Sequence, residues 1–357
     1  AVDIENVVVI VCGGHWHGSG KRGTMFVRSH RFKGSVKFMT RVLIPVLLLV
    51  ITGLEGCSMH SPGQWQSEYY RDHALAGSTW DLQTGMPLSQ HALSEQLKKV
   101  DYLLLGEVHD NLDHHKIQLD LLNLWLEQGM RPAVVFEQFD RSQQSLIDAH
   151  LDDLERLESE TRFEERGWEW NAYKPLIKTA RNEGLSVFAG NLSRDELKAI
   201  HEKESVSEFD DLLKPCLLSS AEALLKQDIA EAHCGMLNET MIDRMFGAQR
   251  LRDASLAQAM ITAGTPSLMI AGNGHVRLDY GAGQILSLNQ DKQVLSIALV
   301  EVAGELQGLQ DYEYLFSDGV PVFDIAIFTP RVRDEDPCET FKEQLKQIQH
   351  GTKPGSN

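Results

Sequence analysis

Two copies of the pattern Gly-x-x-His stand near the ends of apolar runs that lie far apart in the sequence. The first copy is at 106–109 and the second at 272–275. Four side chains in or near these segments, or after the similar run at 133–136, could take part in chemistry: Glu107, His109, Glu137 and His275. Apolar runs that end in polar groups are typical of buried strands whose carboxyl ends form the ligand-binding edge of an α/β sheet. We therefore expect the four side chains to meet in one cleft.

Two imidazoles and two carboxylates suit a divalent metal such as zinc, manganese or iron, with positions left open for water. The expected metal ligands are His109, His275 and Glu107. In an enzyme, the metal-bound water would be the nucleophile and the remaining glutamate, Glu137, the general base. The alternative is a hydrogen-bonded cluster that holds the strand ends or orients a ligand, since buried His and Glu side chains are costly unless they are paired. The residues leave both interpretations open.

Strands and helices are expected to alternate along most of the chain. Strands are predicted at 101–107, 133–137, 185–189, 267–271, 294–300 and 322–328, and helices at 88–99, 114–128, 141–150, 170–184, 194–203, 219–232, 241–263 and 341–348. Such alternation indicates βαβ units. The predicted fold class is therefore α/β, with three layers: a mostly parallel sheet with helices on both faces. The charged segment 152–169 is expected to be an exposed helical excursion.

The beginning of the sequence resembles a bacterial lipoprotein signal. Residues 1–38 show no sustained period and are interpreted as upstream translation or disorder, with Met39 as the start. Residues 39–56 combine a short basic region with ten apolar residues, too few to span a bilayer as a helix. They lead to Cys57, the expected lipidation site, and Ser58 favours the outer membrane. The alternative is a signal peptide cut elsewhere or an anchor that is not cleaved.

The expected organisation after the signal is a tether at 57–79, one domain at 80–330, and a C-terminal helix and tail at 331–357. The expected location is the outer membrane, lipid-anchored and facing the periplasm. The chain has 34 basic and 51 acidic residues and a formal charge of −17, which argues against nucleic acid as a partner. Cys216 and Cys234 flank a helical stretch and are expected to pair. Since no Cys-x-x-Cys is present, a structural zinc knuckle is not expected.

Four motifs together resemble the ChaN family of haem-binding, iron-regulated bacterial lipoproteins, which are related to the Tiki proteases and the erythromycin esterases. They are Gly-Glu-Val-His-Asp-Asn at 106–111, Phe-Glu-Gln-Phe-Asp at 136–140, Trp-x-x-Tyr-x-Pro at 170–175 and Gly-Asn-Gly-His at 272–275. The resemblance covers about residues 80–301. It implies an α/β fold, outer-membrane attachment and a role in haem uptake. It also implies a homodimer around haem, with a tyrosine on the iron and a partner histidine nearby, and a receptor or transporter that exchanges haem with the protein.

The resemblance directs attention to residues that could hold haem. Tyr280 is the expected axial ligand and Arg277 the expected partner of a propionate, with His275 and His109 as further cofactor-binding candidates. The alternatives remain that Tyr280 is only a turn residue, or that the ligand is Tyr312, Tyr314 or His233. We expect a haem-binding protein rather than an enzyme. The alternative is a metal-dependent hydrolase of the Tiki or erythromycin-esterase type, with Glu107, His109, Glu137 and His275 as catalytic residues.

Overall fold

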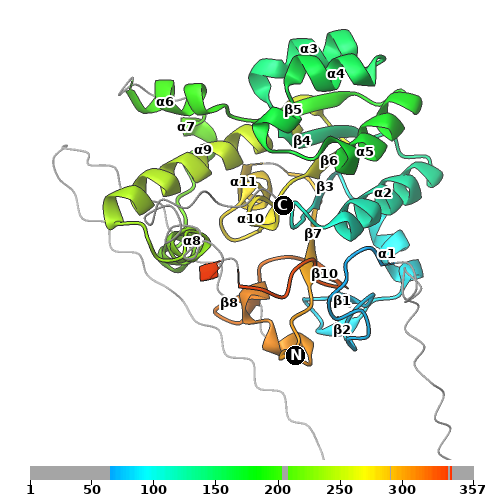
Figure 1. Cartoon of the computed structure of the whole chain (residues 1–357), viewed down its shortest axis with the longest axis vertical. Coiled ribbons are helices and arrows are strands. Elements are labelled where there is room, and N and C mark those ends of the chain that lie inside the picture. Colours follow the sequence, from blue (N-terminus) through cyan, green and yellow to red (C-terminus); the bar gives the residue numbers. More distant parts are fainter. Residues whose placement is uncertain (1–64, 203–207, 290, 337, 340–357) are drawn as a thin grey trace, which may run out of the picture. The chain divides into compact units, whose positions relative to one another are not determined.

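The computed structural model describes residues 65–202, 208–289, 291–336 and 338–339 of the 357-residue chain. The strands in these ranges are β1 (Thr79–Asp81), β2 (Met86–Pro87), β3 (Tyr102–Leu105), β4 (Ala133–Asp140), β5 (Val187–Asn191), β6 (Ser267–Ile270), β7 (Val294–Glu301), β8 (Phe316–Ser317), β9 (Val320–Pro321) and β10 (Ile325–Thr329). Eight of these described strands form one sheet in the order β2-β1-β10-β7-β3-β6-β4-β5, and β8 pairs with β9 (Figure 1).

The sheet is mostly parallel. Neighbouring strands from β10 to β5 run parallel, while β1 and β2 are antiparallel at one edge. The central strands β3 and β6 are buried along their whole length, as expected for parallel strands covered on both faces. The predicted α/β fold class is therefore confirmed.

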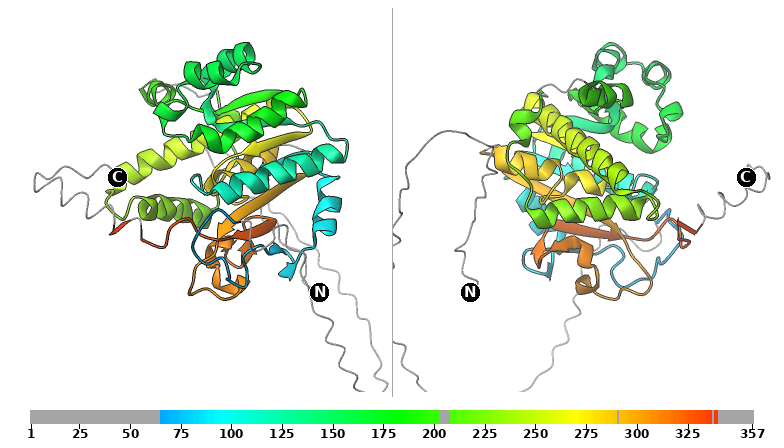
Figure 2. Two further views of the ribbon diagram at one scale, coloured as in Figure 1. Left: turned by 45° about the vertical axis from the view of Figure 1, so that its right-hand side comes forward. Right: turned by 90° about the vertical axis from the view of Figure 1, so that its left-hand side faces the viewer.

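Helices cover both faces of this sheet. The helices in the described ranges are α1 (Gln90–Leu97), α2 (Leu112–Glu127), α3 (Gln144–His150), α4 (Leu154–Thr161), α5 (Trp170–Asn182), α6 (Arg194–Glu202), α7 (Asp210–Leu213), α8 (Ser219–Ala232), α9 (Glu239–Ala263), α10 (Asn273–Val276) and α11 (Ala282–Asn289). Successive strand residues point to opposite faces, so Leu103 and Leu105 pack with α1 to α5, whereas Leu104 packs with α9 to α11. Figure 2 shows these two helical layers from two further directions.

Helix α8 lies outside this three-layer arrangement. Its buried residues Ala221, Leu225 and Ile229 form a separate small cluster with Tyr280, against which Met245 and Phe246 of α9 pack. Helix α8 therefore covers α9 and the segment after α10, side by side with α9 in Figure 1. This arrangement brings residues from three separate parts of the chain around Tyr280.

Asparagine side chains begin two of the helices that position the site. Asn111 accepts hydrogen bonds from the backbone N–H groups of Asp113 and His114 at the start of α2. Asn238 accepts one from Met241 at the start of α9, at 2.9 Å. Both side chains satisfy N–H groups that have no partner within the helix. Helix α9 ends at Ala263 and is followed by Gly264, which has a φ of +78°.

Several local predictions differ from the structure. The segment 152–169 is not wholly exposed, because Leu154, Leu157 and Phe163 are buried in the core. The expected tether packs onto the domain from residue 65 onward: Trp65 is buried, and the N–H groups of Gln66 and Ser67 bind the Asp113 carboxylate. The last predicted strand, 322–328, begins only at residue 325, and helix α11 was not predicted.

The expected pairing of Cys216 with Cys234 is wrong, since Cys234 forms its disulfide with Cys338. This bond joins the second residue after α8 to the end of the described chain, a pairing that sequence proximity does not indicate. Several predictions lie outside the described residues: the segments 1–38 and 39–56, the start at Met39, the lipidation site Cys57 with Ser58, and the helix at 341–348. Among the described helices, none is both long enough and apolar enough to span a membrane.

Candidate functional site

The ends of β3, β4 and β6 bring together the four side chains singled out in the sequence. These strands are neighbours in parallel register, so their carboxyl ends lie at the same edge of the sheet. Glu137, on β4 one residue beyond the pairing of this strand with β6, accepts a hydrogen bond of 2.8 Å from the N–H of Gly272, just after β6. Glu107 and His109 follow β3, and His275 lies on α10 after β6. The expected convergence on one cluster is therefore present in the structure.

The buried carboxylate of Glu107 is the acceptor around which one half of the cluster is built. It accepts hydrogen bonds from the His109 ring (2.8 Å), Gln118 (2.8 Å), Gln138 (2.9 Å) and the hydroxyl of Tyr173 (2.5 Å). These donors come from α2, β4, α5 and the segment after β3. Two helices and one strand are thus tied to the segment that carries this carboxylate.

Glu107 and His109 form a charged pair. Burial disfavours the ionised form of Glu107, but hydrogen bonds from His109 and His115 outweigh this effect and hold its pKa well below the usual range. Burial also opposes the charge on His109, yet the carboxylates of Glu107 and Glu137 raise its pKa to about 9. The His109 side chain is 45% exposed, and its ring meets Trp168 edge to face at 4.9 Å. His109 is therefore a cation at neutral pH that solvent can reach.

The other half of the cluster places His275 between two carboxylates. Its Nδ1 lies 2.7 Å from Asp253 on α9, and its Nε2 lies 3.3 Å from Glu137. Burial opposes the charge on His275, but the two carboxylates raise its pKa to about 10. Burial likewise opposes the charge on Glu137, and the nearby His275 and His109 lower its pKa to about 2. The Asp253 side chain has no sequence motif around it and was not predicted.

The two Gly-x-x-His motifs pack against one another, and the contacts are made at their glycines. A Cβ on Gly106 would lie 2.1 Å from the Oδ1 of Asn273, and a Cβ on Gly272 would lie 3.0 Å from the His109 ring. Asn273 binds the carbonyl (2.7 Å) and the N–H (3.2 Å) of Leu299 on β7. The glycine of each motif therefore makes room for a side chain of the other.

The geometry of this cluster fits a hydrogen-bonded clamp better than a metal site. Both carboxylate oxygens of Glu107 accept hydrogen bonds from protein donors, and both ring nitrogens of His275 face carboxylates. Across the described parts of the chain, no group of three or more His, Cys, Asp or Glu side chains is arranged to hold a metal ion. The expected set of Glu107, His109 and His275 is thus close together without forming such a group.

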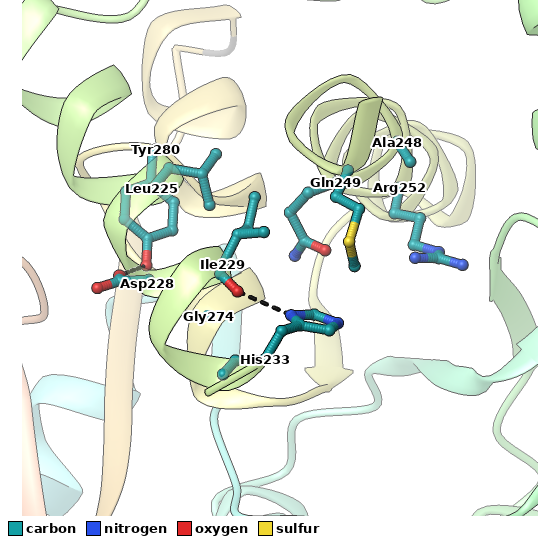
Figure 3. Close-up of a pocket in the computed structure, with 11 residues that line it drawn as sticks. Leu225, Asp228, Ile229, His233, Ala248, Gln249, Arg252, Gly274 and Tyr280 are labelled. Atoms are coloured by element: carbon teal, nitrogen blue, oxygen red, sulfur yellow. Dashed lines mark hydrogen bonds between the residues drawn. The ribbon is translucent and has the colours of Figure 1, made fainter. Parts of the chain in front are cut away.

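A second candidate site surrounds Tyr280. A cavity of about 430 Å³ lies between α8, α9 and the segment that carries Gly274 and Tyr280. A neighbouring cavity of about 310 Å³ shares Asp228, Gly274 and Tyr280 with it. The Tyr280 hydroxyl donates a hydrogen bond of 2.5 Å to Asp228 on α8 (Figure 3). Burial, together with this aspartate, raises the pKa of Tyr280 far above the usual range.

The other residues expected to hold haem have different surroundings. The guanidinium of Arg277 stacks on the Tyr280 ring at 4.4 Å, and its Nε and Nη2 bind Asp279 at 2.9 and 2.7 Å. These two guanidinium nitrogens of Arg277 are therefore already bound to a carboxylate of the protein. Tyr312 is buried, and its hydroxyl accepts a hydrogen bond from a backbone N–H. Tyr314 is 52% exposed and lines the smaller cavity.

The sequence interpretation missed most of the residues around the larger cavity. Those on α8 and α9 are Leu225, Asp228, Ile229, Ala232, Met245, Ala248, Gln249 and Arg252; His233, the residue after α8, also lines the cavity and was an alternative ligand. Helical periodicity predicted both helices but not that α8 packs over α9. Tyr173 was part of a recognised motif, but the hydrogen bond from its hydroxyl to Glu107 could not be predicted from the sequence, because the two residues are 66 positions apart.

Comparison with known proteins identifies the family. A family model described as haem-binding uptake, Tiki superfamily, ChaN matches residues 93–286, more than half of the chain. The chain belongs to the ChaN family. The resemblance inferred from the four motifs is thereby confirmed. Membership of this family supports a general role in haem binding and uptake.

Comparison with solved structures supports the fold through one of them. ChaN of Campylobacter jejuni, in a structure that describes cofacial haem binding, matches 70% of this chain and 95% of its own, with 18% identity and a TM-score of 0.55. A histidine mutant of the erythromycin esterase EreC in its open conformation matches 73% of this chain and 98% of its own, with 12% identity and a TM-score of 0.38. A search of curated proteins gives no match.

Proposed function

We propose that this ChaN family member binds haem in the two adjoining cavities, with the Tyr280 hydroxyl as the axial ligand of the iron. The observation that carries the proposal is the position of Tyr280, which lines both cavities at the place where they meet. Family membership supports haem as the ligand. Tyrosine is a known axial ligand of haem iron.

The chemistry of the cavities suits a porphyrin. Their walls are largely apolar, with Leu225, Ile229 and Met245 around the larger cavity and Val300 and Phe323 around the smaller one. Sites of a few hundred Å³ with apolar walls and few polar groups are typical for small-molecule cofactors. The bound haem would supply a ferric iron that accepts a phenolate oxygen. Asp228 holds the phenol proton of Tyr280 in place before haem enters.

We further propose that the protein is an outer-membrane lipoprotein, anchored through lipid on Cys57 and facing the periplasm. The resemblance of residues 39–57 to a lipoprotein signal supports this placement. A homodimer around haem, and a receptor or transporter that exchanges haem with it, are part of the same proposal. The cofacial haem binding described for ChaN of Campylobacter jejuni supports the dimer.

Titration with ferric haem tests the proposal. The full chain should give a saturable new Soret band at about one haem per protein. Tyr280→Phe should shift or abolish this band, while Tyr312→Phe, a matched change at a buried tyrosine outside both cavities, should leave it unchanged. A band that persists in Tyr280→Phe but is lost in Tyr314→Phe would move the ligand to Tyr314. The absence of any saturable band in the wild type would refute haem binding.

The second candidate function is a hydrolase that uses Glu107, His109, Glu137 and His275. The chain of contacts from Asp253 through His275 to Glu137, together with the exposed His109, is the observation that favours it. Both histidines are cations at neutral pH, so neither can act as the general base, and the ionised carboxylate of Glu137 is left for that role. A hydrolase should lose activity in Glu137→Gln, and a metal-dependent one also on chelation, whereas haem binding should tolerate the chelator.

A further inference from the structure

Two arginines, Arg250 and Arg277, contact Tyr280 and are engaged within the protein, whereas a third, Arg252, lines the same cavity farther from Tyr280. Arg277 binds Asp279 through two nitrogens, and Arg250 binds the carbonyl of Tyr280 and the side chain of Gln284. Their charges and donors already have partners. They are therefore poor candidates for binding a charged group of an incoming ligand.

The third arginine, Arg252 on α9, differs from both. It lines the larger cavity, and its Nε is buried without a hydrogen-bond partner among the described residues. The carboxylate of Asp140 senses the charge of Arg252 but forms its ion pair with Arg166. A buried polar nitrogen that lacks a partner is costly, and a ligand that supplies an acceptor would remove this cost.

The position of Arg252 in the cavity defines what it can reach. Figure 3 shows Tyr280 and Asp228 at one end of the cavity and Arg252 at the other, with Ile229 and Gln249 between them. The wall between the two ends is mainly apolar. A ligand that spans this length would have an apolar body, a group that meets the Tyr280 oxygen, and an anionic group at its far edge.

Charge also favours an anion at Arg252. The chain has a formal charge of −17, and the other charged residue of the larger cavity is the acidic Asp228. A ligand with carboxylates would be repelled by such a protein unless a cation lies at the place where the carboxylates bind. Arginine meets a carboxylate through two parallel N–H···O bonds, which gives both strength and orientation.

We infer that Arg252 anchors a carboxylate of the ligand that occupies the Tyr280 cavity, and so sets the orientation of that ligand. The inference rests on the proposed haem-binding function, in which the carboxylate is a propionate of haem. In this arrangement the iron meets Tyr280 at one end and a propionate meets the guanidinium of Arg252 at the other. Arg252, rather than Arg277, is thus the residue that selects a porphyrin with free carboxylates.

Paired titrations of the full chain with ferric haem and with haem dimethyl ester, which lacks the carboxylates, test this inference. Arg252→Gln should bind haem roughly 10- to 100-fold more weakly than the wild type, the range expected for losing a charged hydrogen bond. The same variant should bind the dimethyl ester as tightly as the wild type does, which also shows that the cavity is intact. Arg252→Lys should retain part of the haem affinity.

Arg244→Gln is the matched control, because Arg244 lies on the same helix, is exposed, and does not line the cavity. It should leave both affinities unchanged. Equal haem affinities of Arg252→Gln and the wild type would overturn the inference while leaving the proposed function in place. An equal loss of both ligands in Arg252→Gln would overturn it too, since the carboxylate would not be the partner. Failure of the wild type to bind either ligand would refute the proposed function itself.

Discussion

Gly272 lies against the imidazole of His109, so that a Cβ at position 272 would stand 3.0 Å from Cε1 and Nε2 of the ring. The reciprocal contact involves Gly106, whose Cβ would stand 2.1 Å from the Oδ1 of Asn273. A side chain at either glycine would therefore collide with a residue of the other Gly-x-x-His motif, which explains why both positions are glycine.

The two glycines should differ in their tolerance of a methyl group. Asn273 is held by two hydrogen bonds to Leu299 and cannot withdraw, whereas the His109 side chain is 45% exposed and can move outward. Gly106→Ala should therefore lower the free energy of unfolding by about 2–3 kcal/mol, and Gly272→Ala by about 1 kcal/mol. Urea denaturation measures both. Gly247→Ala, inside α9 with open space around its Cβ, should instead stabilise by about 0.5–1 kcal/mol.

Replacing the central carboxylate should destabilise the whole sheet edge. Glu107→Gln removes the charge that His109 and His115 face, and it places an amide NH2 among four hydrogen-bond donors. We expect a loss of about 3–5 kcal/mol in the free energy of unfolding, the usual cost of breaking a buried ion pair. Glu95→Gln, which affects an exposed pair with Lys98, should leave this free energy nearly unchanged. Equal changes in the free energy of unfolding for Glu107→Gln and Glu95→Gln would contradict a stabilising role of the hydrogen-bonded cluster around Glu107.

The two charged histidines predict an alkaline loss of stability. His109 and His275 have folded-state pKa values of about 9 and 10, above the ordinary value of 6.5. Their contribution to stability is fully present below about pH 6.5 and declines as the pH rises through 9 to 10, because the folded state binds protons that the unfolded state has lost. The stability difference between the wild type and His275→Gln should therefore shrink between pH 6.5 and 10.

Urea midpoints measured at pH 6, 8 and 9.5 provide the data. His91→Gln, on the exposed side of α1, is the control and should differ from the wild type by the same small amount at each pH. A stability difference for His275→Gln that stays constant from pH 6 to 9.5 would show that His275 is neutral in the folded protein.

Much of the fold and the first cluster could be predicted because the signal is local. Apolar runs with polar ends predicted β3, β4 and β6, and parallel strands place their ends together. The remaining contacts involve residues with no local signal. Asp253 lies within the long helix α9, and Cys234 pairs with a cysteine 104 residues away, so both depend on how distant segments pack. The cavity at Tyr280 exists only because α8 packs over α9.

Haem affinity should depend on pH through Tyr280. Burial and Asp228 raise the pKa of its phenol, so the phenol is protonated throughout the working range, and an iron–phenolate bond must displace this proton. Since haem binding releases a proton, the affinity for haem should increase by up to about tenfold for each unit by which the pH is raised. Asp228 can keep the displaced proton only near or below its own pKa, which burial also raises.

Soret titrations between pH 6.5 and 8.5 measure this slope. In Tyr280→Phe no phenol proton is displaced, so any residual haem binding should lose the slope along with the tyrosinate spectrum. Tyr312→Phe should retain both, because that tyrosine lies outside the two cavities. If the wild-type affinity does not depend on pH and Tyr280→Phe does not change the spectrum, the iron binds another residue. The ligands to test next would then be Tyr314 at the smaller cavity and His233 at the larger one.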